Sequence, residues 1–183
     1  MPGRRDEQDE IRNPPHRNTP VVDSAGARGL RRYEPRDEDA AIALWLRTWC
    51  AAYPQIDFAA RLDWWRERWR GELVPSTEIV VAEIGGAIAG FVTVDPRTLY
   101  LDQIVVAPEH WGTGLADALI EAARQVSPSG LDLDVNTDNA RAICFYEKCG
   151  FSICGAGVNP ISGKPVHRMS WRPQAAPRSG QIS

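Results

Sequence analysis

Hydrophobic positions along the chain switch between helical and strand spacing. In two early segments apolar residues recur every three or four positions, which is the spacing of an amphipathic helix. One segment carries Ile42, Trp45, Leu46 and Trp49, and the other carries Phe58, Leu62, Trp65 and Trp69. We predict two helices from this pattern, the first capped by Asp37 and the second starting after Asp57 and ending at Gly71.

The remaining segments read mainly as strands. Strands are predicted over residues 30–33, 79–84, 87–94, 99–106, 131–136, 151–154 and 166–171, and further helices over 112–126 and 139–149. Gly85-Gly86 is a typical two-residue hairpin turn between the second and third strands. The order is therefore β-α-α-β-β-β-α-β-α-β-β. Three consecutive strands joined by tight turns exclude a purely parallel sheet, so the fold class is α/β (α+β), with a mixed sheet and helices on its faces.

Both ends of the chain differ from this patterned region. Residues 1–27 are rich in charge and proline and contain few apolar side chains, and residues 173–183 are similar. Such segments cannot bury enough apolar surface to offset the entropy of ordering them. We predict two disordered tails around one folded domain at 28–172, a size typical of a single domain.

Charge and apolar runs narrow the class of protein. The chain of 183 residues has 21 Lys and Arg against 24 Asp and Glu, and 21 − 24 gives a net charge of −3. A dedicated nucleic-acid binder usually has a basic excess, so no nucleic-acid partner is expected. The longest apolar run, residues 40–46, is far below the roughly 20 residues of a membrane span. With no signal or transit pattern at the N-terminus, we expect a cytoplasmic protein without membrane contact.

Residues that could carry metal or nucleophilic chemistry are scattered. The four cysteines show no C-x-x-C spacing, and His16, His110 and His167 show no H-x-x-x-H spacing. Neither a G-x-S-x-G nor a G-x-x-x-x-G-K-[ST] motif occurs. We therefore expect no metal, no disulfide and no covalent nucleophile.

Two segments point to chemistry. In the first, the strand ending at Val106 leads into Trp111-Gly112-Thr113-Gly114-Leu115-Ala116, where glycines open a helix. The first turn of a helix has unpaired N–H groups and partial positive charge, and glycine lets an anion approach them. Taken alone, the same glycines equally suit an ordinary turn. The second segment is the helix 139–149 followed by Gly150-Phe151, which alone indicates only an amphipathic helix and a stop.

Together, in this order, the two segments resemble the GNAT superfamily of acetyl-CoA-dependent N-acetyltransferases. The first matches that family's [Q/R]-x-x-G-x-[G/A] loop, except that Trp111 stands where the family has Gln or Arg. The second matches N-x-x-A-x-x-F-Y-E-x-x-G-F at every specified position, namely Asn139, Ala142, Phe145, Tyr146, Glu147, Gly150 and Phe151. The resemblance covers about residues 28–172 and implies a mostly antiparallel mixed sheet with splayed central strands and helices on both faces. The tryptophan removes a polar side chain but leaves a cradle made of backbone groups undisturbed.

The resemblance also implies where acetyl-CoA, the expected co-substrate, would lie. Its pantetheine arm occupies the gap between the splayed strands 99–106 and 131–136. On the first strand the segment Ile104, Val105 and Val106 borders this arm, with backbone groups of Ile104 and Val106 pairing with its amides. Asn139 makes a polar contact to the arm, and Tyr146 lies beside the thioester sulfur as a general acid. Backbone N–H groups hold the pyrophosphate along Gly112, Thr113, Gly114, Leu115, Ala116 and Asp117.

The reaction implied is direct attack of an amine on the thioester. Asp134 is our first candidate for the base, because the related ribosomal-protein alanine acetyltransferases have a glutamate at the matching place. Because an aspartate is one methylene shorter than a glutamate, we expect a water to relay the proton from the amine to Asp134. Asp102 is the second candidate, and a merely solvated carboxylate remains open for both. The two early helices cover the acceptor side in this family, with Tyr53 and Pro54 at the rim and Trp64 as a possible groove residue.

Three functional interpretations remain open from the sequence. The first is an N-acetyltransferase acting on a primary amine of a small molecule or peptide. The second is a GNAT fold that binds CoA without catalysis, against which the retained Asn139 and Tyr146 speak. The third is an enzyme whose acceptor is a partner chain. The acceptor and the choice between monomer and homodimer are not specified by any motif.

Overall fold

The computed structural model describes residues 28–160 and 162–174, so the tail predicted over 1–27 and most of that over 173–183 lie outside the described residues. The strands are β1 (Arg28–Arg32), β2 (Glu78–Ile84), β3 (Ala87–Asp95), β4 (Tyr100–Val106), β5 (Leu131–Asn136), β6 (Ser152–Val158) and β7 (Pro165–Trp171). The helices are α1 (Glu38–Ala52), α2 (Leu62–Arg68), α3 (Val74–Ser76), α4 (Leu115–Val126) and α5 (Ala140–Lys148). Apart from the three-residue α3, the elements and their order agree with the sequence prediction.

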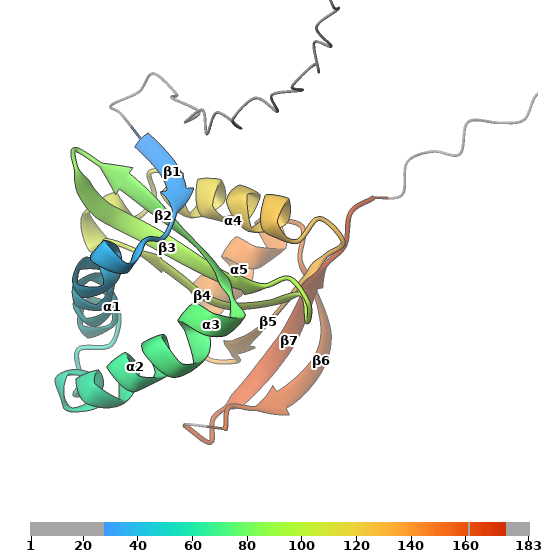
Figure 1. Ribbon diagram of the computed structural model, residues 1–183. Helices are drawn as coiled ribbons and strands as arrows, with labels where there is room; N and C mark the ends of the chain where they lie inside the picture. Colours follow the sequence, from blue (N-terminus) through green and yellow to red (C-terminus); the bar gives the residue numbers. More distant parts are fainter. Residues whose placement is uncertain (1–27, 161, 175–183) are drawn as a thin grey trace, which may run out of the picture.

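Seven strands form one mixed sheet in the order β1-β2-β3-β4-β5-β7-β6 (Figure 1). All neighbours pair antiparallel except β4 and β5, which are parallel. The β2–β3 hairpin turns at Gly85 and Gly86, whose φ angles of 60° and 80° are those a tight hairpin turn demands of both residues. The predicted mixed, mostly antiparallel sheet is confirmed.

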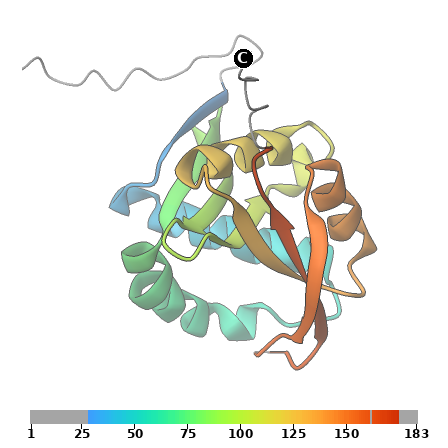
Figure 2. The same cartoon turned by 90° about the vertical axis from the view of Figure 1, so that its right-hand side faces the viewer.

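Each face of the sheet carries its own hydrophobic core. On one face α4 and α5 pack over β2 to β5, and Leu119, Leu133 and Tyr146 are buried there. On the other face α1 and α2 cover β2 to β4, with Trp45, Trp65 and Trp69 at the centre. Figure 2 shows the helices distributed over both sides of the strands. Three of the early tryptophans thus form core, whereas Trp64 is 40% exposed.

The central strands β4 and β5 separate almost at once. Their register contains a single pair, Tyr100 with Asp132, supported by a hydrogen bond of 2.8 Å from the Asp132 amide to the Leu99 carbonyl. From there the two strands diverge toward their carboxyl ends (Figure 1). This is the splayed pair that the family resemblance implies.

A bulge in β4 decides which way its side chains face. The pairing moves from Val94–Leu101 to Thr93–Gln103, so Asp102 is an extra residue. The buried Thr93 hydroxyl accepts a hydrogen bond of 3.0 Å from the Gln103 amide, which satisfies the interrupted ladder. As a result Leu101 packs into the α4 core while Val105, four residues on, packs into the α1–α2 core.

Two helix boundaries predicted from the sequence are wrong. Asp37 does not cap α1 with its side chain, because that carboxylate binds Arg31 and the Glu34 amide. The second helical stretch does not stop at Gly71 but continues through a π-helical segment, Trp69–Leu73, into α3. Burial of Trp69 and Leu73 outweighs the roughly 1 kcal/mol that glycine costs within a helix.

Smaller differences occur elsewhere. Helix α4 begins at Leu115 rather than 112, because Gly112 and Gly114 have φ angles of 76° and 82° and cannot continue a right-handed helix. The predicted strand 151–154 extends to Val158. Within the described residues no helix is long and apolar enough to cross a membrane.

Candidate active site

The loop between β4 and α4 has the geometry expected of an anion cradle. Both glycines take left-handed conformations, and a side chain added at Gly112 would meet no atom within 4 Å. Gly114 is the N-cap of α4, and no side chain of the described residues caps this helix. The first-turn N–H groups of the twelve-residue helix α4 are thus left for another acceptor, which is what a phosphate requires.

The end of β4 faces the gap between the splayed strands. The Ala107 amide bonds to the Ala89 carbonyl of β3, so by alternation the backbone groups of Ile104 and Val106 point away from β3 toward the gap, and those of Val105 toward β3. The Val106 carbonyl already accepts two hydrogen bonds, from the Trp111 indole at 2.8 Å and from the Thr48 hydroxyl at 3.3 Å. A pantetheine amide would have to replace one of them to use this carbonyl.

Asn139 connects α5 to the helices on the other face. Its side-chain oxygen caps α5 by accepting from the Ala142 amide at 3.1 Å. Its amide nitrogen donates to the Tyr53 hydroxyl at 3.1 Å, across the open end of the gap. Burial, together with the charge of Asp138, raises the pKa of Tyr53 above its usual range. The two bonds fix the orientation of the asparagine side chain, and its amide nitrogen keeps a second N–H donor for a ligand.

Tyr146 is held in the core beneath the gap. It is 8% exposed and packs against the rings of Phe145 and Phe151, with centroids 5.3 and 5.5 Å away. Burial raises the pKa of its hydroxyl well above the usual value, and the nearby Cys149 and Tyr100 add to the rise. The phenol is neutral at physiological pH and can donate a hydrogen bond or a proton.

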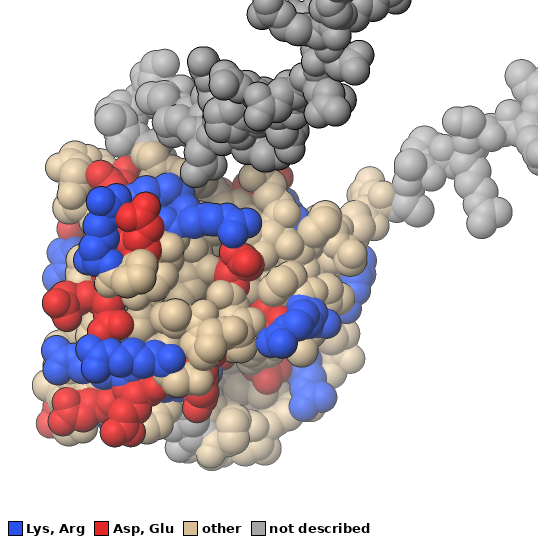
Figure 3. All heavy atoms as spheres, viewed as in Figure 1, with Lys and Arg blue, Asp and Glu red and all other residues tan. Residues whose placement is uncertain are grey.

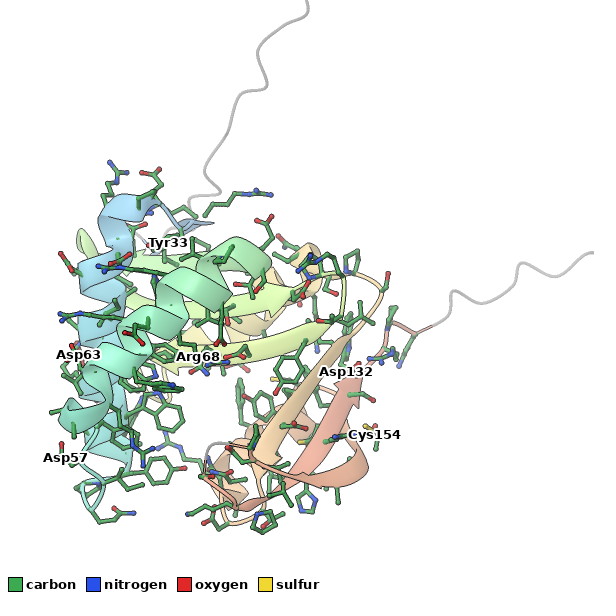
Figure 4. All side chains as sticks on the ribbon, turned by 60° about the horizontal axis from the view of Figure 1, so that its bottom comes forward. Tyr33, Asp57, Asp63, Arg68, Asp132 and Cys154 are labelled. Carbon is green, nitrogen blue, oxygen red and sulfur yellow. The ribbon has the colours of Figure 1, made fainter. Side chains whose placement is uncertain are left out.

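A pocket of about 690 Å³ lies on the opposite face, between the end of α2 and strands β4, β5 and β7. In Figure 4, Arg68 on α2 borders the hollow on one side, and Asp132 on β5 and Cys154 on β6 border it on the other. Tyr100, Asp102 and Asp134 line it at the point where β4 and β5 part. The pocket thus meets the splayed strands from the side of α1 and α2, while Tyr146 approaches from the side of α4 and α5.

The four aspartates of the pocket differ in how fully they are engaged. Asp95 accepts from Arg97 at 3.1 and 3.3 Å, and Asp132 from Arg172 at 2.8 and 2.9 Å. Asp102 accepts from Arg68 at 3.1 and 2.5 Å and from Gln103 at 2.9 Å. Among residues 28–160 and 162–174, Asp134 has one cationic neighbour, Arg168 at 3.8 Å, which is too far for a hydrogen bond.

Of the two candidate bases, Asp134 is therefore the one with free acceptor capacity. Its side chain is 34% exposed and opens into the pocket. Asp102 is tied to Arg68 and Gln103, and taking a proton there would break a bidentate ion pair.

Tyr100 and Arg68 were not identified from the sequence. Burial and the charges of Asp134 and Asp102 raise the pKa of Tyr100 to about 12, which keeps a neutral hydroxyl beside the two carboxylates. Arg68 lies on a helix 34 positions before its partner Asp102. No local motif marks either residue, since both depend on contacts across the sheet.

Comparison with known proteins identifies the family. The profile described as "Acetyltransferase (GNAT) family" matches residues 38–151, more than half of the chain. The chain belongs to the GNAT acetyltransferase family. It is an acyltransferase of the N-acetyltransferase type, as the sequence predicts.

Individual members of the family match over most of the domain. Peptidyl-lysine N-acetyltransferase YjaB of Salmonella typhimurium is 28% identical over 137 residues, covering 74% of this chain and 91% of the relative. The ribosomal-protein-S18-alanine N-acetyltransferase of Escherichia coli superposes with a TM-score of 0.64 at 21% identity, covering 85% of this chain and 99% of the other. The PaiA N-acetyltransferase of Thermoplasma acidophilum, solved in complex with coenzyme A, superposes with a TM-score of 0.62 at 16% identity, covering 80% and 99%. The structural likenesses support the GNAT fold.

Metal-ligating side chains do not cluster in the part of the chain that the structure describes. Within residues 28–160 and 162–174 no three His, Cys, Asp or Glu side chains come together as metal ligands, and all four cysteines are free.

Proposed function

We propose that this GNAT protein transfers the acetyl group of acetyl-CoA to a primary amine that enters through the pocket beneath α2. The proposal rests on two groups that lie on opposite faces of the sheet, at the gap where β4 and β5 diverge. The open carboxylate of Asp134 lies on the acceptor side of β5, and the buried phenol of Tyr146 lies on the side of α4 and α5. Acetyl-CoA and the amine can thus meet at this gap and react directly, without a covalent enzyme intermediate.

In this scheme the amine loses a proton to Asp134, directly or through one water, and its nitrogen attacks the thioester carbonyl. The C–N bond forms, the C–S bond breaks, and Tyr146 gives its proton to the departing sulfur. The second proton lost by the nitrogen then returns to the Tyr146 oxygen, and Asp134 releases the first proton to solvent, so both residues regain their starting state. The Gly112–Asp117 segment and the gap-facing backbone of Ile104 and Val106 hold the donor. Positioning both reactants in this way contributes on the order of 7–11 kcal/mol to lowering the barrier.

We further propose that the amine is the side chain of a lysine in a peptide. Freeing an alkylamine of pKa about 10.4 from its proton at pH 7 costs about 4.6 kcal/mol, against about 1 kcal/mol for an α-amine near 7.8. The carboxylate of Asp134 accepts no hydrogen bond from a cation of the described residues, so it is open to accept the proton of an alkylamine, which is the costlier one to remove. The name of the Salmonella relative, a peptidyl-lysine N-acetyltransferase, supports the same acceptor class. Figure 3 shows acidic and basic side chains interspersed on the side of the molecule that carries α1, α2 and α3.

An acceptor panel tests the proposal. Thiol release from acetyl-CoA would be measured with three acceptors: a peptide with one internal lysine and a blocked N-terminus, a lysine-free peptide with a free N-terminal alanine, and 1,4-diaminobutane. We expect the lysine peptide to give a kcat/KM at least about tenfold above the others.

The outcomes separate the alternatives. Preference for the alanine peptide or the diamine would contradict the lysine assignment while leaving acetyl transfer intact. CoA binding by calorimetry without transfer to any amine would favour the non-catalytic CoA-binding module.

A further inference from the structure

Arg141 and Trp111 form a stacked pair beside the glycine loop. Arg141 lies in the first turn of α5, and its guanidinium carbon is 4.9 Å from the centroid of the Trp111 ring. The edge of the indole is also held, because its N–H donates to the Val106 carbonyl at 2.8 Å. A residue beyond β5 is thereby held against the residue that directly precedes Gly112.

The charge of Arg141 is not neutralised by a neighbouring acid. Most arginines of the fold lie in ion pairs, such as Arg31 with Asp37, Arg68 with Asp102 and Arg172 with Asp132. For Arg141 no carboxylate partner exists among the residues that the structure describes, and the side chain is exposed. Stacking on the ring orients the guanidinium while leaving its N–H donors free.

The stack involves the one loop residue that departs from the family motif, Trp111. The family motif has Gln or Arg at the position of Trp111, so this chain lacks a polar side chain in the loop itself. The fold brings a guanidinium onto the ring of Trp111 from a different element. An arginine beside unpaired helix N–H groups is the combination that recognises a phosphate.

We propose that Arg141 is a phosphate-binding residue of the donor site, held in position by Trp111. This inference rests on the proposed function, since the phosphates are those of CoA. The pyrophosphate and the 3′-phosphate present the same chemistry to a guanidinium, and the planar fork of Arg141 can bind either one bidentately.

The test is calorimetric titration of CoA into the wild type, Arg141→Gln and Lys148→Gln. Lys148→Gln is the matched control, because Lys148 lies in the last turn of the same helix and its replacement also removes one positive charge. We expect Arg141→Gln to weaken CoA binding about tenfold, or about 1.4 kcal/mol, and to lessen its dependence on salt concentration. We expect Lys148→Gln to change affinity less than about twofold.

Repeating the titration with dephospho-CoA, which lacks the 3′-phosphate, identifies the phosphate. If Arg141 holds the 3′-phosphate, the difference between wild type and Arg141→Gln disappears with this ligand. If it holds the pyrophosphate, the difference persists. Either result supports the proposal.

Equal CoA affinity of Arg141→Gln and wild type overturns it, as does an equal loss in Lys148→Gln. Wild type that binds no CoA would instead refute the proposed function. If Arg141→Gln does not fold, Arg141→Lys takes its place, with an expected loss of about threefold because charge is kept and the planar fork is lost.

Discussion

At the scale of single residues, the two proposed catalytic groups lie in opposite environments. Tyr146 is buried among aromatic rings, while Asp134 is partly exposed and has no hydrogen-bonding cation. Burial keeps the phenol protonated, and access to solvent lets the carboxylate exchange protons. Each environment suits the role proposed for its residue.

Replacing Tyr146 by Phe removes the hydroxyl and keeps the ring in its packing. We expect kcat to fall about 100-fold with little change in KM for acetyl-CoA, because the lost interaction is with the leaving thiolate. Since burial raises the pKa of Tyr146, wild-type kcat should show no decline from tyrosinate formation up to about pH 10. An unaltered kcat in the variant would assign the hydroxyl a structural role.

Asp134→Asn removes the proposed base at nearly constant volume. We expect kcat/KM to be depressed most at neutral pH and to recover as pH rises, because hydroxide then deprotonates the amine. The deficit should be larger for a lysine peptide than for an α-amine, following the 4.6 and 1 kcal/mol costs estimated above.

The measurement is a pH–rate profile with one acceptor of each kind. Asp132→Asn is the comparison, since it removes a carboxylate from the same face of β5 that is already paired with Arg172. Profiles of wild type and Asp134→Asn that superimpose would exclude Asp134 as the base.

At the scale of elements, the glycine loop and the bulge in β4 together create the site. The loop ends β4 and begins α4 with unpaired N–H groups, and the bulge at Asp102 turns Val105 toward the α1–α2 face. One device serves the donor and the other shapes the acceptor pocket. Both depend on local departures from regular geometry.

Gly114→Val tests the loop. A β-branched residue at φ 82° is strained, and its side chain would project where the pyrophosphate is proposed to lie. We expect CoA affinity to fall at least about 100-fold. Gly85→Val is the control, because it imposes similar strain at φ 60° in the β2–β3 turn, where an added side chain meets no atom within 4 Å.

The two variants should lose similar thermal stability, while only Gly114→Val loses CoA binding in calorimetry. Unchanged affinity in a folded Gly114→Val protein would contradict the cradle.

At the scale of the whole molecule, an ion-pair network ties the first strand to the rest of the fold. Arg31 on β1 donates to Asp37 at 2.6 and 2.8 Å and to Glu83 on β2 at 3.0 Å. Asp37 is 5% exposed and also accepts from the Glu34 amide. The pair thus joins β1, the start of α1 and β2.

Hydrogen bonds from Arg31 lower the pKa of Asp37 below its ordinary 3.8. A carboxyl with a lowered native pKa stabilises the fold above its unfolded pKa and loses that contribution as pH falls through the native value. We expect Asp37→Asn to lose about 2 kcal/mol of unfolding free energy at pH 7.

Denaturant unfolding of both proteins at several pH values measures this. The difference should shrink progressively below about pH 4. A difference that does not depend on pH would mean that packing, and not the charge, is responsible.

The sequence by itself determined the family, the order of elements and the positions of the donor motifs. These features are local: glycines that need left-handed φ angles, apolar spacing with a fixed period, and two motifs read within a few residues. Asn139 and Tyr146 were identified in this way, and the structure orients one at the gap and buries the other beside it. The helix start at Leu115 differed by three residues from the prediction for the same local reason, the conformation of the two glycines.

Tertiary structure alone decided which polar groups are engaged and which are free. Asp37 resembles a helix cap in sequence, but its carboxylate accepts hydrogen bonds from Arg31 and the Glu34 amide instead. Asp102 and Asp134 are alike as strand carboxylates, yet Asp102 accepts hydrogen bonds from Arg68, 34 positions away, whereas the nearest arginine of Asp134, Arg168, lies 3.8 Å from it. The stack of Arg141 on Trp111 brings the two motifs into contact, although the residues are 30 positions apart along the chain. Such pairings depend on distances across the sheet, and periodicity along the chain carries no information about them.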